Sequence, residues 1–246
     1  MPQSVASERI KQVLAGIPPH ITVLAAAKTR SPEEVRMALE AGVQTIGHNY
    51  VQEAATSLEA LGRRPATKPT EERAAFVDER SRDFDPLSFE THLIGHLQRN
   101  KAKLAVHLFD CIQTVDSLRL AEAIDRASAN IERVMPVLIE INAAREPQKA
   151  GVPPEAAMEL IYRISELSSI RINGLMTMGP LVTDPEEIRP SFAETKRLFD
   201  ELSARQILNV EMRVLSMGMS TSYQIAIEEG ATMIRLGTAL FGPRQP

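Results

Sequence analysis

Lys28 has the most distinctive chemical potential in this sequence. It closes the segment 21–28, whose other residues are β-branched or small and mostly apolar. Such a segment predicts a buried strand. An amine held between apolar walls has a lowered pKa and can form a Schiff base with a carbonyl compound. The alternative is a lysine at a strand end that simply extends to water.

Two glycine-containing segments near the C-terminus could bind an anion. Residues 216–220 and 235–238 each combine glycine with a hydroxyl side chain, and backbone N–H groups in such turns can converge on a phosphate. Alternatively, the glycines only permit tight turns. Together with Lys28, these segments indicate a phosphorylated carbonyl compound, either pyridoxal phosphate (PLP) or a sugar phosphate of the kind that lysine aldolases use.

The elements that must position these residues alternate between strands and helices. Continuously apolar strands followed by helices are typical of parallel strands buried on both faces. We therefore predict an α/β fold, a single-domain (β/α)8 TIM barrel over residues 1–246. A doubly wound open sheet is the alternative. The eight predicted strands lie at 21–28, 45–49, 91–96, 111–115, 134–142, 171–178, 212–217 and 233–240.

Two further features complete the predicted barrel. Residues 4–15 show helical spacing of apolar residues, and we expect this extra N-terminal helix to take the place of the eighth outer helix. Ser31 and Glu34 have the spacing of a capping box at the start of the helix after the first strand. Residues 63–88 are charged and interrupted by prolines, so we predict a partly disordered surface insertion.

Composition narrows the class of protein. The formal net charge of −4 and the pI of about 5.8 argue against a nucleic-acid-binding surface. The single cysteine, Cys111, fits a reducing compartment, and its apolar neighbours predict a buried, unreactive thiol. The sequence contains no membrane-spanning run and no signal-peptide core. We expect a cytoplasmic protein without nucleic-acid or membrane partners.

His92 and His96 raise the question of a metal site, because histidines four residues apart on a helix can share an ion. On the predicted strand they would lie about 13 Å apart. We therefore predict no metal site.

Five segments resemble, in order, the signature blocks of the PLP homeostasis proteins of the YggS/PROSC type, which are related to the barrel domain of bacterial alanine racemase. Together they extend over nearly the whole chain apart from residues 63–88. The segments are AAAKT at 25–29, HNYVQE at 48–53, HLIGHLQRNK at 92–101, LSMGMS at 215–220 and RLGTALFG at 235–242.

The resemblance implies a fold-type III barrel that holds PLP as an internal aldimine on Lys28. By position, Asn49 would lie beside the ring and Arg235 would face the pyridine nitrogen. A guanidinium cannot accept a proton, so it would weaken PLP as an electron sink. The residues that the resemblance implies for the phosphate are Ser216, Met217 through its backbone N–H, Gly237 and Thr238.

His48 departs from the family pattern, because many relatives carry glutamate before the Asn-Tyr pair. A neutral imidazole could keep a polar contact at this place, so we expect His48 to lie at the site.

The resemblance also favours a carrier or regulator in PLP homeostasis without a clear catalytic activity. Racemisation needs a second acid/base on the opposite face of the cofactor; in alanine racemase this is a tyrosine from an additional β domain, which we do not expect here. None of Tyr50, Tyr162 and Tyr223 is an obvious substitute. We expect a monomer whose partners are PLP, amino acids and PLP-dependent apo-enzymes. The alternatives are an amino-acid racemase-like enzyme and a Schiff-base aldolase acting on a phosphorylated sugar.

Overall fold

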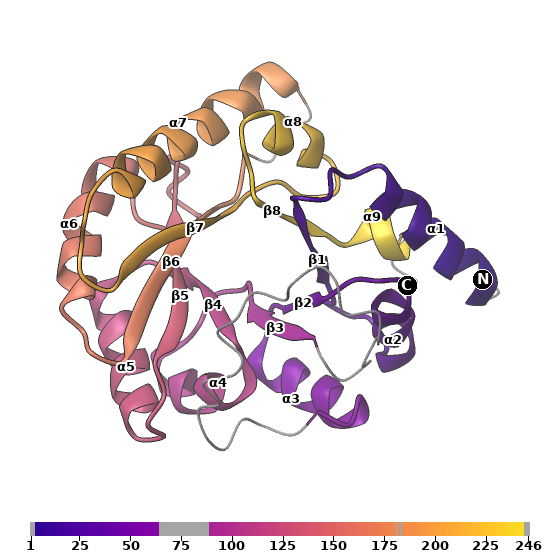
Figure 1. Ribbon diagram of the computed structural model, residues 1–246, viewed down its shortest axis with the longest axis horizontal. Helices are drawn as coiled ribbons and strands as arrows, with labels where there is room; N and C mark the ends of the chain where they lie inside the picture. The colour runs from indigo at the N-terminus through magenta and orange to yellow at the C-terminus, as the bar shows by residue number, and fades with distance from the viewer. Residues whose placement is uncertain (1–2, 64–88, 181, 183, 244–246) are drawn as a thin grey trace.

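The computed structural model describes residues 3–63, 89–180, 182 and 184–243. Its eight strands pair in chain order, all in parallel, and β8 pairs with β1 to close a barrel (Figure 1). This confirms the predicted TIM barrel and excludes the open sheet. The strands are β1 (Thr22–Ala26), β2 (Thr45–His48), β3 (Glu90–Leu93), β4 (Cys111–Val115), β5 (Met135–Ile141), β6 (Ile170–Thr177), β7 (Val210–Ser216) and β8 (Met233–Leu236).

Helices surround the barrel on its outside (Figure 1). Apolar faces of these helices pack on the outward side chains of the strands and form the larger of the two core layers. The helices are α1 (Gln3–Ala15), α2 (Pro32–Glu40), α3 (Val51–Ala60), the 3-10 helix η2 (Arg99–Lys101), α4 (Ala102–Leu108), α5 (Leu118–Ala129), α6 (Pro154–Ser165), α7 (Pro185–Ser203), α8 (Tyr223–Glu228) and α9 (Thr238–Phe241).

Local capping signals set several helix starts. The capping box of Ser31 and Glu34 is present at α2, and the Asp184 side chain accepts from the N–H of Glu186 at α7. At α5 the N-cap is Ser117. The predicted last strand was too long: the chain turns at Gly237, whose carbonyl starts the short helix α9.

The N-terminal helix covers the seam of the barrel, which is the junction where β1 pairs with β8. α1 packs against α9 and α2 (Figure 1), and Ile10 of α1 is fully buried. The Arg30 guanidinium lies 5.2 Å from the centre of the Phe241 ring and donates to the carbonyl of Gly242 at 2.6 Å. α1 and α9 together occupy the place of the eighth outer helix, as predicted.

Alternate strand residues fill the inside of the barrel with small apolar clusters. Cys111 packs there with Leu138 and Met176, and Leu24 packs with Ile94 and Met233 in a second cluster. Burial raises the pKa of the Cys111 thiol well above its ordinary value. The expectation of a buried thiol is confirmed.

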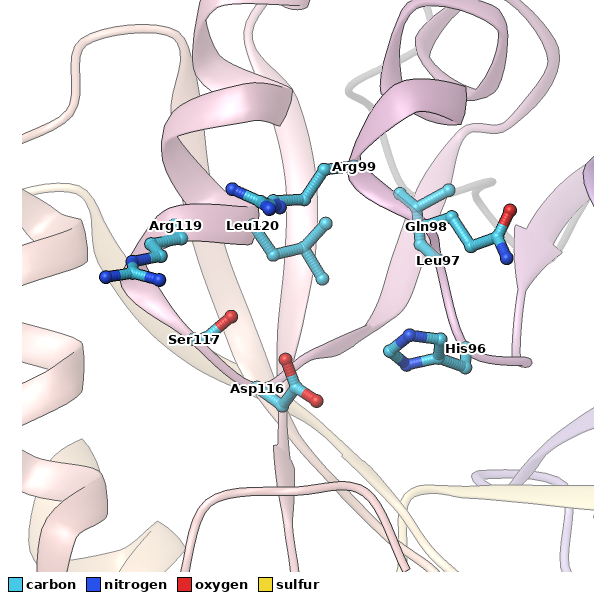
Figure 2. A pocket seen from close by; sticks show the side chains of 8 residues that line it. All are labelled: His96, Leu97, Gln98, Arg99, Asp116, Ser117, Arg119 and Leu120. Carbon is cyan, nitrogen blue, oxygen red and sulfur yellow. The ribbon is translucent and has the colours of Figure 1, made fainter.

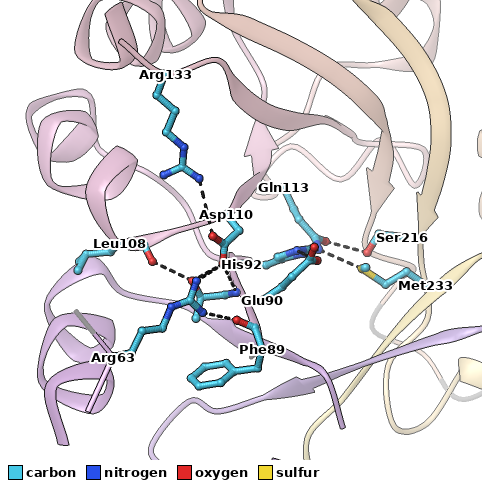
Figure 3. Close-up of polar contacts among 11 residues, drawn as sticks. Arg63, Phe89, Glu90, His92, Leu108, Asp110, Gln113, Arg133, Ser216 and Met233 are labelled. Atoms are coloured by element: carbon cyan, nitrogen blue, oxygen red, sulfur yellow. Dashed lines mark hydrogen bonds and ion pairs between the residues drawn. The ribbon is translucent and has the colours of Figure 1, made fainter. Parts of the chain in front are cut away.

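An arginine–aspartate cluster ties the amino ends of β3 and β4 to the end of α3 (Figure 3). Arg63 donates to the carboxylate of Asp110 and to the carbonyl of Phe89. The N–H of Thr91 donates to the same carboxylate at 2.8 Å, and Arg133 lies 3.8 Å from it. The amino end of a TIM barrel is the face concerned with stability. The cluster joins Arg63, the first residue of the predicted insertion, to Phe89 directly after it, and residues 64–88 lie outside the described part of the chain.

No helix within the described ranges is long and apolar enough to cross a membrane.

We expect Asp110→Asn to destabilise the protein by about 3 kcal/mol, because it removes one partner of a buried charge cluster. Burial alone would raise the pKa of Asp110, but Arg63, the Thr91 N–H and Arg133 together hold it below its ordinary value. A lowered folded pKa stabilises the protein above the unfolded pKa, and this stabilisation is lost as the pH falls. The gap between wild type and variant should therefore shrink in acid, as urea unfolding at several pH values will measure.

Asp200→Asn is the matched control, because Asp200 forms an exposed i,i+4 pair with Lys196 and should cost less than about 1 kcal/mol. An equal cost for both variants would show that the Asp110 cluster does not contribute to stability as described.

Candidate functional site

Lys28 lies at the carboxyl end of β1, on the rim of the barrel. Leu24 and Ala26 face the interior of the barrel. Side chains alternate between the two faces of a strand, so Lys28, two residues after Ala26, lies on the interior side. Its Nζ lies 5.4 Å from the centre of the Tyr50 ring, the N-cap residue of α3. The turn after Lys28 is held by Thr29, which has a φ of 62° and donates its N–H to Glu53 at 2.6 Å. The amine is thus half-buried beside an aromatic face.

Asn49 lies next to Lys28 at the end of β2. The backbone of Gly95 approaches Asn49 so closely that a Cβ on Gly95 would lie 2.8 Å from the Asn49 Cα. Glycine is therefore required at 95 for the ends of β2 and β3 to meet. The half-buried Asn49 side chain is on the rim.

The turns after β7 and β8 meet at one hydroxyl group. The Ser220 Oγ accepts from the N–H of Gly237 at 3.2 Å and from the N–H of Ala239 at 3.1 Å. A Cβ on Gly237 would find no neighbour closer than 3.8 Å, and that neighbour is Ala26 of β1. Two N–H donors thus converge next to the strand that carries Lys28, where a Cβ on Gly237 would make only ordinary contacts.

Gly218 makes the first of these turns possible. It has a φ of +88°, and a Cβ there would lie 2.5 Å from the Cβ of Ala226. Both the backbone conformation and the contact with α8 therefore require glycine.

Two of the residues expected at the phosphate make hydrogen bonds within the barrel. Ser216 is fully buried; its hydroxyl donates to Gln113 at 2.8 Å and accepts from Arg235 at 2.8 Å. The N–H of Met217 donates to the carbonyl of Met233. Both groups are used in bonds within the barrel, because β7 continues in register with β8 to this point. Ser220, from the same segment, is the serine at the turn.

Arg235 is buried inside the barrel, with 4% of its surface exposed. One guanidinium nitrogen donates to Ser216 and the other to the carbonyl of Thr177 at 2.8 Å. Burial lowers the pKa of Arg235 to about 10, and the charge of Glu140 acts in the opposite direction. The guanidinium therefore remains charged at neutral pH.

A chain of polar side chains crosses the barrel interior to Ser216 (Figure 3), which accepts from Arg235. The Nε2 of His92 contacts Glu90 at 3.1 Å, its Nδ1 contacts Gln113 at 2.8 Å, and Gln113 continues to Ser216. The sequence analysis missed Gln113 and, on β5, Glu140. The only signal of each in the sequence was a polar or charged side chain within a mostly apolar strand.

A basic pocket of about 380 Å³ opens on the same rim, after β3 and β4 (Figure 2). Arg99 and Arg119 lie on one side of it, and His96 and Asp116 lie on the other. Neither arginine forms an ion pair with any residue that the structure describes. Ser117, the N-cap of α5, lines the pocket and makes no capping bond with its hydroxyl.

His48 does not lie at the site, contrary to expectation. It is fully buried outside the barrel, 6.4 Å from Phe109 between ring centres, and neither ring nitrogen has a hydrogen-bond partner among the described residues. The cause is the strand period: its neighbour Gly47 faces the interior, so His48 faces the helices.

Within the described ranges, no group of three or more His, Cys, Asp or Glu residues is arranged to hold a metal ion. His92 lies inside the barrel and His96 lines the rim pocket.

Comparison with known proteins agrees with this arrangement. The family model for the alanine racemase N-terminal domain matches residues 8–245. The chain is 38% identical over 223 residues to the pyridoxal phosphate homeostasis protein of Aquifex aeolicus, covering 91% of this chain and 87% of that protein. It is 32% identical to the protein of the same name from Synechocystis, with 95% and 96% covered.

Solved structures show the same fold. PipY of Synechococcus elongatus, solved with PLP bound, has a TM-score of 0.79 and 31% identity, with 96% of this chain and 100% of that chain covered. Alanine racemase of Clostridium difficile has a TM-score of 0.72 at 14% identity; 99% of this chain matches 56% of that enzyme. The second likeness concerns the barrel fold alone.

The buried imidazole of His48 should make stability depend on pH. Burial, with a smaller contribution from the charge of Arg63, lowers its pKa from 6.5 to about 4. The unfolded chain therefore binds a proton more readily than the folded protein between these values, and stability falls as the pH drops through this window. From about pH 7 to about pH 5 we expect the contribution of His48 to fall by about 2 kcal/mol, measured as the change in the difference between the unfolding free energies of wild type and His48→Leu.

His48→Leu should remove this loss, while His20→Gln, a change at an exposed histidine, should retain it. Chemical denaturation at both pH values tests this. The same acid sensitivity in His48→Leu as in wild type would contradict the assignment.

Proposed function

This chain belongs to the family of pyridoxal phosphate homeostasis proteins, and we propose that it binds PLP at the rim formed by β1, β2 and β8. The observation that carries the proposal is the convergence of the Gly237 and Ala239 N–H groups on Ser220, next to Ala26 at the end of β1. This arrangement brings an anion cradle next to the strand that bears Lys28.

The turn after β8 fits a phosphate. Backbone N–H groups that already share one oxygen acceptor can serve a phosphate oxygen. The hydrogen bonds of the described residues use the Ser220 hydroxyl oxygen only as acceptor, so its proton can be donated outward. We assign the phosphate to Gly237, Thr238, Ala239 and Ser220; Ser216 supports Arg235 instead, and we assign no contact to the N–H of Met217.

Lys28 is the residue that we propose joins PLP covalently. Its amine would bond the aldehyde carbon with loss of water, and PLP so bound supplies an electron sink for amines. Tyr50 flanks the amine and shields one side of it from solvent. Asn49, on the neighbouring strand end, would orient the ring.

Arg235 would face the ring nitrogen from below, inside the barrel. Its bonds to Ser216 and to the Thr177 carbonyl fix the guanidinium in place. Because this group stays charged and has no acceptor, it would leave the ring nitrogen without a proton. A weak electron sink suits a protein that holds PLP more than one that uses it.

The role that we propose is holding and carrying PLP in the cytoplasm as a monomer, with transient contacts to PLP-dependent apo-enzymes. The basic rim pocket gives a place for an amino acid. Arg99 and Arg119 could bind its carboxylate, and Asp116 could bind its ammonium group.

An amino-acid racemase-like enzyme is the second candidate function, and the position of Tyr50 near the Lys28 amine favours it. A tyrosine beside the amine is a candidate acid or base for such a reaction. Racemase turnover above that of free PLP, lost in Tyr50→Phe, would select this function over carriage. An aldolase acting on a phosphorylated sugar would instead cleave its substrate with no need for PLP.

We expect purified protein mixed with PLP to show the visible absorbance of a lysine-bound pyridoxal, and Lys28→Ala to lose it. After borohydride reduction, mass spectrometry should place a pyridoxyl group on the peptide that contains Lys28. Lys103→Ala, a change at an exposed lysine of α4, should behave as wild type. Modification of Lys103 or of other surface lysines in place of Lys28 would refute the proposal.

Gly237→Ala should weaken PLP binding without unfolding the barrel. The added methyl group lies next to the converging N–H groups and meets no protein atom closer than 3.8 Å. We expect the Kd to rise about tenfold, or about 1.4 kcal/mol.

Gly16→Ala is the control for this change, because a Cβ there also meets only ordinary contacts, after α1. Fluorescence titration with PLP measures both variants, and equal affinity in the two would mean that the phosphate binds elsewhere.

A further inference from the structure

Glu140 is a carboxyl group buried inside the barrel that the assigned functions do not use. It follows Leu138 on β5 by two residues, and Leu138 packs in the interior with Cys111 and Met176. Only 2% of Glu140 is exposed, and its Oε2 has no hydrogen-bond donor among the described residues.

The charged groups that act on Glu140 are Arg235 from β8 and Asp116 from the end of β4. The neighbouring interior position on β6 is the uncharged Met176. Arg235 directs its guanidinium to Ser216 and to the Thr177 carbonyl, and Glu140 is in none of the ion pairs found among the described residues.

A carboxylate in this position lacks what ionised groups need inside a protein. Without a donor on Oε2 and without a paired cation, the charged form loses its hydration and gains little in return. Burial therefore raises the pKa of Glu140 to about 7; the negative charge of Asp116 adds to this increase and Arg235 opposes it. The missing donor to Oε2 and the negative charge of Asp116 both favour the protonated form of Glu140.

We propose that Glu140 takes up a proton in the folded protein as the pH falls to neutral, and that the neutral acid leaves the positive charge of Arg235 uncompensated for an anion bound at the rim. Ionised Glu140 would cancel much of the field of Arg235 inside the low-dielectric barrel. The neutral acid preserves that field, which makes Glu140 a positioning residue for the charge of the site.

The coupling is reciprocal. An anion at the rim makes ionisation of Glu140 still less favourable, so binding draws a proton onto Glu140, and deprotonation weakens binding by the same factor. Anion affinity should therefore fall as the pH rises through the titration of Glu140. This second consequence rests on the proposed PLP function, whereas the protonation itself does not.

The first experiment uses the protein without PLP and compares wild type with Glu140→Gln, a neutral side chain of the same shape. The folded pKa lies above the unfolded value of 4.5, so wild type loses the stabilising contribution of protonated Glu140 as the pH rises from there to about 7. Glu140→Gln should not, and the gap between their denaturation midpoints should widen over this window and stay constant above it. Carboxyl 13C NMR of labelled glutamate should show one resonance that titrates near neutral pH and is missing in the variant.

The second experiment measures PLP affinity between about pH 6 and pH 8.5. The ratio of the wild-type Kd to the Glu140→Gln Kd should rise about fivefold over this range, within the usual span of coupling between sites. Taking the ratio cancels the titrations of Lys28 and of the phosphate. Glu159→Gln, at an exposed position of α6, should match wild type in both experiments.

The outcomes separate the two claims. A constant midpoint gap with no neutral-range resonance overturns the protonation of Glu140, whether or not PLP binds. A constant Kd ratio with PLP bound overturns the coupling. Failure of all variants to bind PLP refutes the proposed function, while the first experiment still decides the state of Glu140.

Discussion

The parallel pairing of the first strand with the last is the constraint on which the site depends. Leu24 of β1 lies opposite Arg235 of β8, and Ala25 lies opposite Leu236. One step further along, this register brings Ala26 beside Gly237. The strand that carries Lys28 and the turn with the converging N–H groups are therefore neighbours, although more than two hundred residues separate them in the chain. A doubly wound sheet would leave these strands at separate positions without this contact.

The barrel interior is divided between apolar packing and a polar chain. The chain from Glu90 through His92, Gln113 and Ser216 satisfies the donors and acceptors that the closed sheet encloses. It ends on Arg235, whose charge is held by neutral partners and not by a carboxylate. A buried cation in this state keeps its electrostatic influence on the rim above it. Glu140 belongs to the same electrostatic unit, since its ionisation would change that influence.

The two ends of the barrel have different tasks. At the amino end, the Asp110 carboxylate contacts the side chains of Arg63 and Arg133 and the N–H of Thr91. These contacts join the starts of β3 and β4 to the end of α3. At the carboxyl end, the guanidinium groups of the rim pocket form no ion pair with any residue that the structure describes. Free polar groups cost stability unless they meet a ligand or water. This difference is expected for a barrel whose carboxyl rim binds small molecules.

The comparison with relatives shows the family to which the chain belongs and the fold that it shares with them. The family membership agrees with the five sequence blocks, and the PLP-bound relative has the same barrel. The residues that differ from the expected pattern, His48 above all, are explained by strand geometry. A histidine that faces the helices cannot contact a ligand inside the barrel, whatever its neighbours in the sequence do.

The sequence by itself determined the alternation of strands and helices, and with it the barrel, the N-terminal helix over the seam and the placing of Lys28 on the rim. These depend on local periodicity and capping, which each segment carries alone. The tertiary structure decided which polar groups are already used. In the folded chain Ser216 is hydrogen-bonded to Gln113 and Arg235, and Ser220 lies at the turn. Glu140 is buried, and its Oε2 has no donor among the described residues. The physical reason is that strand period tells only which face a side chain takes, whereas its hydrogen-bond partners and charge come from strands that only barrel closure brings together.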